Sequence, residues 1–280
     1  MAAIDDARTR GLAFLFAVPL LLLLVLFEVM PLLAVLFDGF IAAGQWSLAN
    51  YQNILGSKFQ RNAFLTSFEL SIATALIGVA AALPLAVTLQ RMPLNVRRVV
   101  LSYANIGANF TGFPIAFAFI VLFGFSGFFT LILVHFGIVK GLNIYSLTGL
   151  VLVYAYFQIQ LGLLLLYPAL AAITPDLREA ARLMGAGTVS FWRRVGLPIL
   201  MPALIGTAVL LFANAMGTYA TAYALVGGNA NIVTIRIGEL IAGDVFNDPH
   251  RADALATLLV ATLILPILAE QLLLKRRRHG

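Results

Sequence analysis

The stretch EAARLMGAGTVSFWRRVGLP, from Glu179 to Pro198, is polar and carries three glycines. The chain around it has the opposite character. Of its 280 residues, 61% are hydrophobic and only 11% are charged, whereas about a quarter of an average globular protein is charged. A polar segment between long apolar runs has to be explained together with a membrane fold.

Six apolar runs are each long enough to cross a bilayer, for which a helix needs about 20 residues. Each run is continuous, whereas the strands of a membrane β-barrel alternate between apolar and polar residues. The sequence therefore predicts an all-α, polytopic membrane protein with one transmembrane domain over residues 1–280. The predicted spans are residues 12–37, 62–89, 100–123, 146–173, 201–226 and 253–274. A further apolar stretch, 127–141, is short and bounded by glycine, which favours an interfacial or re-entrant helix.

Lysine and arginine are distributed unevenly between the predicted loops. If the N-terminus lies inside the cell, the outer loops contain only Lys58, Arg61, Lys140, Arg236 and Arg251. The other 13 of the 18 Lys and Arg residues then lie in cytoplasmic segments, as the positive-inside rule requires. Both chain ends, and the loop 174–200 between the fourth and fifth spans, are therefore expected in the cytoplasm. The basic tail, 275–279, is expected to contact membrane lipid.

The residues that several other function classes require are missing. The sequence has no cysteine and its three histidines are scattered, so we expect no metal site. It contains no G-x-x-x-x-G-K-[ST] phosphate loop and no nucleophile–base pair, so we expect no catalytic residue, no cofactor and no enzymatic activity in this chain. The net charge of +6 fits basic loops at a membrane, and nucleic acid is not an expected partner.

Local rules predict a compact shape for the loop 174–200. Thr174, Pro175 and Asp176 form a helix start, with a hydroxyl N-cap, a proline at the first position and an acid in the first turn. Gly185 is expected to end this helix in the left-handed conformation. An apolar stripe on the helix is predicted from the spacing of Leu177, Ala180, Ala181 and Met184.

A second short helix is predicted after Gly185. Thr188 is expected to cap it and Gly196 to end it, and Pro198 lies where the fifth span should begin. Two interpretations of the pair of helices remain open at this point. They form either a docking platform, whose Glu179 carboxylate pairs with an arginine of another protein, or a self-contained interfacial segment, in which Glu179 pairs with Arg182 on its own helix.

The loop resembles the EAA loop of type I ABC importer permeases. The family pattern is EAA, three residues, glycine, nine residues and then I-x-L-P. In this chain the corresponding residues are Glu179, Ala180, Ala181 and Gly185, followed at the same spacing by Val195, Gly196, Leu197 and Pro198. The one departure is valine in place of isoleucine at position 195. The resemblance covers most of the chain, including the six spans.

The resemblance implies a six-span permease of the bacterial inner membrane whose loop docks on a separate ATP-hydrolysing subunit. It implies two copies of that ATPase, a second permease subunit, identical or related, and an extracytoplasmic solute-binding protein as partners. The resemblance implies that Glu179, Ala180, Ala181 and Gly185 contact the ATPase subunit. Leu197 and Pro198 would anchor the loop to the fifth span.

Two acids inside the predicted spans suggest a route for the solute. Glu28 and Glu69 both fall in the outer half of the bilayer by their positions along the spans, where an acid is costly and often functional. Polar or aromatic neighbours are expected from Asn105, Asn109, Asn214 and Tyr219. This set would suit a small cation. Alternatively, each acid bonds to a neighbouring helix and never meets the solute.

The segment ANAMGTYATAYALVGG, 213–228, makes the chain similar to the spermidine and putrescine branch of these permeases. A polyamine is therefore the expected solute, with ferric iron, phosphonate or another anion as the alternatives and a sugar after them. Two other function classes compete with the importer. A secondary transporter should show charge relays and broken repeat helices in its spans, and a membrane scaffold would need no polar groups inside the spans.

Overall fold

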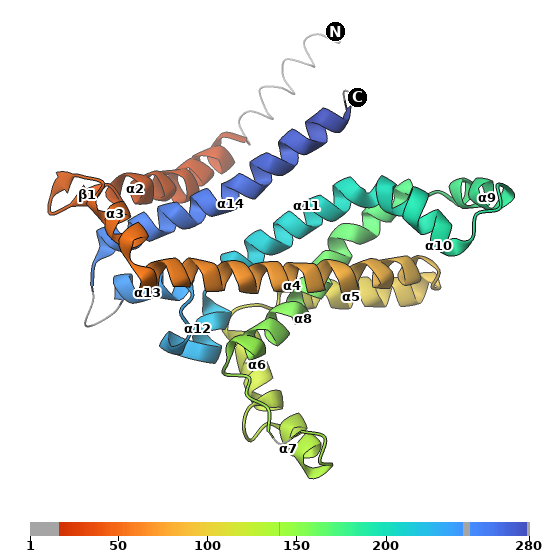
Figure 1. The fold of residues 1–280 in the computed structure, drawn as a ribbon, viewed down its shortest axis with the longest axis horizontal. Helices are drawn as coiled ribbons and strands as arrows, with labels where there is room; N and C mark the ends of the chain where they lie inside the picture. Colours follow the sequence, from red (N-terminus) through yellow and green to blue (C-terminus); the bar gives the residue numbers. More distant parts are fainter. Residues whose placement is uncertain (1–16, 140, 243–246, 279–280) are drawn as a thin grey trace, which may run out of the picture. The chain divides into compact units, whose positions relative to one another are not determined.

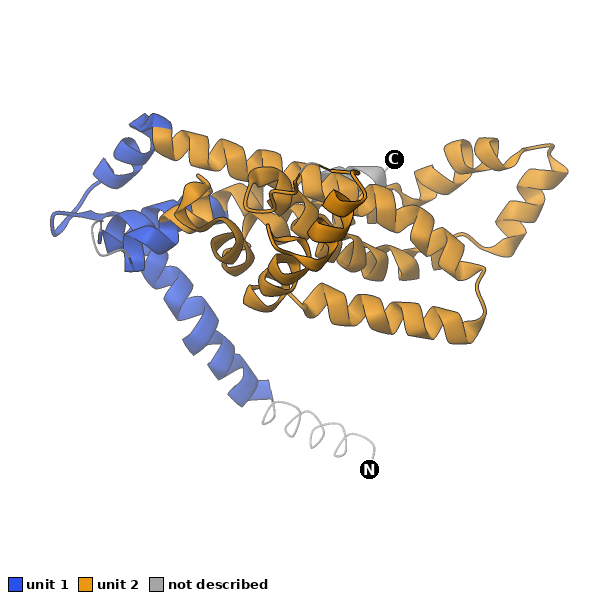
Figure 2. Ribbon diagram, turned by 90° about the horizontal axis from the view of Figure 1, so that it is seen from below, with its two compact units in different colours: residues 1–58, 237–260 blue, residues 59–236, 261–280 orange. Residues whose placement is uncertain are grey.

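The computed structural model describes residues 17–139, 141–242 and 247–278 (Figure 1). The chain divides into two compact units, residues 1–58 with 237–260 and residues 59–236 with 261–280 (Figure 2). Six described helices are long and apolar enough to cross a membrane: Ala17–Asp38, Lys58–Gln90, Phe113–His135, Leu147–Ala172, Thr188–Met216 and Pro249–Leu268. The predicted all-α fold with six membrane helices is confirmed.

The first unit contains the first span and a small cap. The π-helical turn η1 (Val25–Val29) leads into α2 (Met30–Asp38), the short antiparallel strands β1 (Ile41–Ala42) and β2 (Gln45–Trp46), and α3 (Ala49–Gly56). The side-chain amide of Asn50 donates hydrogen bonds to the carbonyls of Gly39 and Ile41, at 3.2 and 2.9 Å. These bonds fix the chain reversal after α2. No residue in the hydrophobic window of the first span is buried against the described part of the chain, so lipid or another subunit is expected to cover it.

The second unit is a bundle built on long helices. It contains α4 (Lys58–Gln90) from its second residue, α5 (Leu94–Asn109), α6 (Phe113–Phe123), α7 (Phe128–His135), α8 (Leu147–Ala169), α11 (Leu197–Met216) and α12 (Ala220–Val226). The 3-10 turns η2 (Leu170–Ala172) and η4 (Gly227–Asn229) follow α8 and α12. The helices α13 (Val233–Ala242) and α14 (Pro249–Arg278) each have residues in both units.

The structure divides the predicted third span, 100–123. Helix α5 begins earlier, at Leu94, and α6 follows only after a break at 110–112. Gly112 has φ +75°, which glycine adopts without strain. The hydroxyl of Thr221 accepts a hydrogen bond from Gly112 N at 2.9 Å and donates one to Gly112 O at 3.2 Å. A hydroxyl on α12 thus supplies the partner that Gly112 N lacks at the break, and it adds a second donor to Gly112 O, which also accepts from Ala116 N at 3.3 Å.

The predicted fifth span, 201–226, is also wrong in its limits. Its helix ends at Met216, and α12 is a separate helix that packs against α6. After Gly217 the chain turns, and Thr218 O accepts hydrogen bonds from the hydroxyls of Tyr154 and Thr234, at 3.1 and 3.3 Å. The prediction, which used apolar composition alone, merged two helices that this turn separates.

The stretch 127–141 is predicted as an interfacial or re-entrant helix. In this stretch the structure has the eight-residue helix α7.

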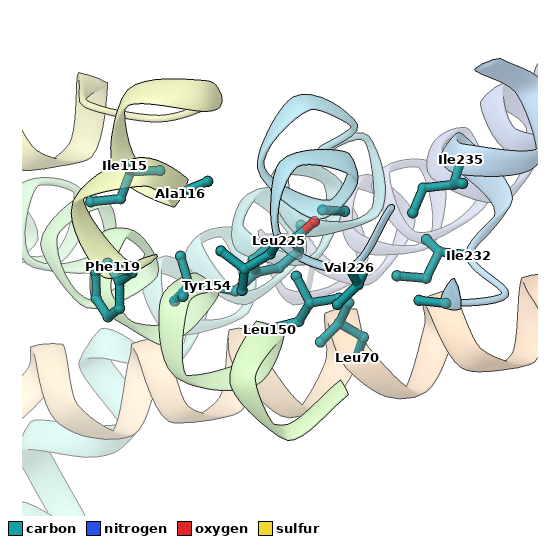
Figure 3. Close-up of a cluster of buried hydrophobic side chains, with 14 of the residues drawn as sticks. Leu70, Ile115, Ala116, Phe119, Leu150, Tyr154, Leu225, Val226, Ile232 and Ile235 are labelled. Atoms are coloured by element: carbon teal, nitrogen blue, oxygen red, sulfur yellow. The ribbon is translucent and has the colours of Figure 1, made fainter. Parts of the chain in front are cut away.

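Helix α8 lies at the centre of the main core. Figure 3 shows Leu150 and Tyr154 of α8 among side chains from α4, α6, α12 and the segment around α13. Tyr154 and Leu150 are fully buried. The core holds the following residues: Leu70, Ile115, Ala116, Phe119, Leu150, Val153, Tyr154, Phe157, Ala215, Ala222, Leu225, Val226, Ala230, Ile232 and Ile235.

Small residues let α4 approach α8 and α11 closely. A β-carbon at Gly78 would lie 2.8 Å from Leu211 Cδ1 and 3.2 Å from Gln158 Cβ, and one at Gly162 would lie 3.1 Å from Ala82 Cβ. Close approach through glycine and alanine is the usual way in which membrane helices gain packing energy. The crossing of these three helices therefore depends on Gly78.

We expect Gly78→Leu to destabilise the protein by about 1–3 kcal/mol, because the side chain would push α4 away from α8 and α11. The measurement is thermal unfolding of the purified chain in mild detergent. Ala80→Leu is the matched control, since Ala80 lies on the exposed face of the same helix. Equal midpoints for the two variants would show that this crossing tolerates a larger side chain.

Candidate functional site: the loop between helices α8 and α11

The first helix of the loop begins as predicted. Helix α9 (Pro175–Leu183) has Thr174 as its N-cap, and the Thr174 hydroxyl accepts a hydrogen bond from Leu177 N at 3.4 Å. Pro175 occupies the first turn, where a missing N–H costs nothing. Asp176 is the acid of that turn. The start of α9 is therefore set by the sequence next to it.

The end of α9 is a Schellman motif around Gly185. Gly185 has φ +76°. Its N–H donates to Arg182 O at 2.9 Å, and the N–H of Ala186 donates to Ala181 O at 2.9 Å. These are the two hydrogen bonds of the motif. The predicted left-handed glycine is confirmed, and it reverses the chain beyond the last turn of α9.

The second helix of the loop differs from the prediction. Helix α10 (Thr188–Phe191) has Gly187 as its N-cap, and Thr188 is its first residue and makes no side-chain capping bond. Gly196 does not end the helix either. The π-helical turn η3 (Trp192–Gly196) connects α10 directly to α11, so that one helix runs from Thr188 to Met216.

A proline explains this π-helical turn. Leu197 N donates to Trp192 O, five residues back, which is the π-helical pattern. Pro198 follows directly; it has no N–H, and its ring would clash with a carbonyl four residues earlier in an α-helix. The same arrangement occurs in the first unit, where η1 lies just before Pro31. A wider turn ahead of each proline keeps the helix continuous, and here Leu197 and Pro198 lie where the loop leads into the fifth span.

The predicted apolar stripe of α9 does not pack on the rest of the chain. Only Ala181 is buried, at 3% exposure, within a cluster that includes Leu170 and Leu200. Leu183 and Met184 are 90% and 81% exposed. Val189, on α10, is 81% exposed as well. We call these three exposed side chains the apolar tip of the loop. Several large apolar side chains exposed on one loop are typical of a contact with another protein.

Glu179 lies on an exposed part of α9 next to this tip. Among the described residues, neither Glu179 nor Arg182 has an ion pair or a hydrogen bond, so the structure does not contain the pairing of the second interpretation. Ala180 is exposed as well. The carboxylate of Glu179 is therefore available to a partner.

Sequence reasoning missed Arg178, which holds α9 in place. Its Nη2 donates to Gln90 Oε1 at 3.4 Å, at the end of α4, and its guanidinium lies over the ring of Trp192 at 5.9 Å. The nitrogen Nε is buried and has no hydrogen-bond partner among the described residues. Arg178 thus links the loop to a second membrane helix. The signal that the sequence offered was its spacing: Arg178 lies four residues before Arg182, so the two arginines share a side of α9.

The residues expected along a solute route do not form one cluster. Asn109 donates to Asn105 O at 2.8 Å and to Asn105 Oδ1 at 3.1 Å, along one exposed side of α5. Asn214 donates to Gln158 Oε1 at 3.2 Å, and Gln158, fully buried, donates to Leu211 O at 2.5 Å. Gln158 and Asn214 therefore join α8 to α11.

The other route residues are placed separately. Tyr219 stacks on Tyr223, with ring centroids 5.4 Å apart. Glu69 is exposed on α4, next to the exposed Leu65 and Ile72, and has no hydrogen bond or ion pair among the described residues. Glu28 is exposed in η1 of the first unit.

Residues 76–279 match the family of binding-protein-dependent transport system inner membrane components. The chain belongs to this family. It is a permease subunit of an ABC transport system and a multi-pass protein of the inner membrane.

Individual relatives are distant and differ in what their names say they carry. A putative ABC transporter permease protein ORF1 of Streptomyces antibioticus is 29% identical over 174 residues, covering 62% of this chain and 69% of that protein. The thiamine transport system permease protein ThiP of Escherichia coli is 27% identical over 208 residues, covering 74% of this chain and 38% of ThiP. A crystal structure of a bacterial ABC transporter that imports alginate has a chain with TM-score 0.76 and 15% identity, with 99% of both chains covered. That structure supports the fold.

We expect Gly185→Val to loosen α9, because a β-branched residue at φ +76° loses about 1–2 kcal/mol to strain. A β-carbon there would meet nothing within 4 Å, so backbone strain is the whole effect. Amide hydrogen exchange in 175–186 should become faster.

Gly187→Val is the matched control. Gly187 lies in the same loop, has φ −70°, and a β-carbon there would also meet no atom within 4 Å. Equal protection of α9 in the two variants would contradict the role given to the left-handed glycine.

Proposed function

We propose that this permease forms half of the translocation pore of an ATP-driven importer, and that α9 is the element that couples it to the ATPase. The observation that carries the proposal is the tip of the loop. Leu183, Met184 and Val189 are exposed next to the unpaired carboxylate of Glu179. An apolar surface beside one available charge has the composition of a docking site.

The chain can transmit movement from that tip to the membrane. Ala181 and Phe191 are buried in one cluster with Leu166 of α8 and Leu200 of α11. The helix that starts at Thr188 continues without a break into the fifth span. A push on α9 therefore acts on both helices that flank the loop, as coupling requires.

The remaining partners follow from the family and from the sequence. The sequence contains no phosphate loop, so a separate chain has to bind ATP. We propose two copies of that ATPase, a second permease subunit that completes the pore, and an extracytoplasmic binding protein. The distribution of lysine and arginine supports a cytoplasmic position for the loop 174–200 and for both chain ends.

For the solute we propose a small cation, with a polyamine as the first candidate. Glu69 supports this choice, because it is an exposed carboxylate on a membrane helix whose neighbours Leu65 and Ile72 are apolar. A carboxylate that faced lipid would be costly, so Glu69 is expected to face the pore or the second permease. The exposed pair Asn105 and Asn109 offers polar contacts on α5.

Charge reversal at position 179 tests the docking role. Glu179→Arg should abolish co-purification of the ATPase with the tagged permease from native membranes in mild detergent, because it removes the carboxylate and adds a repelling charge. Asp176→Arg, the same charge change on the same helix, is the control and should retain most of the ATPase. An ATPase that remains bound to Glu179→Arg would remove Glu179 from the interface. Uptake that persists with a catalytically inactive ATPase would favour a secondary transporter.

Uptake by the reconstituted complex tests the solute. Spermidine uptake should fall at least about tenfold in Glu69→Gln, since one carboxylate–ammonium contact is lost, while the amount of assembled complex stays the same. Parallel assays with thiamine, ferric iron, phosphonate and a sugar identify the solute if it is not a polyamine. Unchanged uptake of the transported solute in Glu69→Gln would mean that Glu69 only contacts a neighbouring helix.

A further inference from the structure

A small hollow of about 190 Å³ lies where the end of α4 meets α9 and the start of α10. We call it the arginine pocket, because three of its lining residues are arginines and none is acidic. The full lining is Arg91, Arg178, Arg182, Ala186, Gly187, Thr188, Phe191 and Trp192. Figure 1 shows α9 and α10 at the end of the second unit where α4 leads into α5.

Within the described part of the chain, no ion pair neutralises the three arginines of this pocket, although Glu179 lines the adjoining larger hollow with them. Arg91 and Arg182 form no ion pair or hydrogen bond there. Arg178 contacts only the neutral side chains of Gln90 and Trp192, and its Nε is buried without a partner. Three guanidinium groups around one hollow repel each other, and a buried polar nitrogen without a hydrogen bond costs free energy. An anion would relieve both costs.

The chemistry of the donors favours phosphate. Guanidinium groups bind phosphate oxygens through paired, charge-assisted hydrogen bonds. Gly187 and Thr188, which also line the pocket, stand at the start of the helix that runs to Met216, and the dipole of a long helix adds to the attraction for an anion there. The arginines supply most of the charge.

The position of the pocket favours a lipid as the source of that phosphate. It lies at the end of one membrane helix and the start of another, beside Trp192, and tryptophan is typical of the interface between membrane and water. The same three arginines also line a larger hollow of about 690 Å³, whose other residues include Tyr167, Pro168 and Leu170 as well as Glu179. Its apolar part offers contacts for the remainder of a lipid.

We propose that the arginine pocket binds a phosphate group at the cytoplasmic membrane surface, and that the headgroup of an anionic phospholipid supplies it. The proposal rests on the cytoplasmic position of the loop and not on docking of the ATPase by Glu179. Bound there, the lipid would bridge α4, α9 and α10 and hold the loop against the bundle.

Trp192 provides a reporter inside the pocket. The chain has two tryptophans, so Trp46→Phe leaves Trp192 as the only one. In this background, purified in neutral detergent, dioctanoyl phosphatidylglycerol should change the emission of Trp192 in a saturable way. Dioctanoyl phosphatidylcholine should not. Replacing both exposed arginines, Arg91→Gln with Arg182→Gln, should weaken phosphatidylglycerol binding at least about tenfold, because two charge-assisted contacts are lost.

Arg193→Gln with Arg194→Gln is the matched control. These two exposed arginines lie in the same loop but line neither hollow, so binding should be retained. An equal loss in the control, or no saturable change with phosphatidylglycerol in the parent protein, would overturn the proposal. Inorganic phosphate that binds as tightly as phosphatidylglycerol would support the phosphate site and overturn the lipid as its source.

Two further measurements keep the test independent of folding and of the proposed function. Native mass spectrometry of the parent protein should detect retained phosphatidylglycerol, and its absence would count against the proposal even if the double variant unfolds. Leu183→Asp, a change in the apolar tip at a residue that lines neither hollow, should lose the ATPase and still bind phosphatidylglycerol. Loss of both together would show that the pocket depends on docking, contrary to the proposal.

Discussion

The side chain of Gln158 is the interaction on which the arrangement of the functional loop depends. It is fully buried in α8, donates to Leu211 O and accepts from Asn214, so both of its polar groups are used within α11. In an apolar medium an unpaired amide would be costly, so the two helices are tied at a fixed register. These are the helices that flank the loop. The tie therefore fixes the register of the helix that leads into the loop against the helix that follows it.

The membrane environment explains the irregular parts of the bundle in the same way. The break at 110–112 leaves backbone groups without helical partners, and Thr221 supplies a hydroxyl to both the N–H and the carbonyl of Gly112. At Pro198 the helix avoids a clash by widening into η3 rather than by breaking. The Thr221 hydroxyl permits a break in the helix inside the bundle. The π-helical turn η3 keeps α10 and the fifth span in one continuous helix. Both satisfy the rule that backbone polar groups must be paired.

Local sequence decided part of this structure and tertiary contacts decided the rest. Thr174 and Gly185 act through hydrogen bonds to residues within five positions, so the limits of α9 could be predicted. The break in the third span has a local signal, Gly112 at φ +75° followed by Pro114 in the first turn of α6, but its hydrogen bonds to Thr221, more than 100 residues away, could not be predicted from local sequence. Gly196 has the sequence of a helix end, but a β-carbon there would meet the ring of Trp192 at 2.6 Å. The absence of a β-carbon at Gly196 therefore lets the ring of Trp192 pack against the backbone. Apolar spacing correctly suggested a stripe on α9, but could not show that most of it faces outward.

The faces of α9 divide three tasks among neighbouring residues. Ala181 faces the cluster at the base of the loop. Arg178 and Arg182, four residues apart, line the arginine pocket. Glu179 and Leu183, also four residues apart, do not line it, and both side chains are exposed. Residues at this spacing share a side of a helix. A helix of nine residues is too short to hold its position by its own hydrogen bonds, so contacts on the first two sides must fix the third. Anchoring through Ala181 and Arg178 therefore determines how firmly α9 transmits the force of a bound partner to the spans.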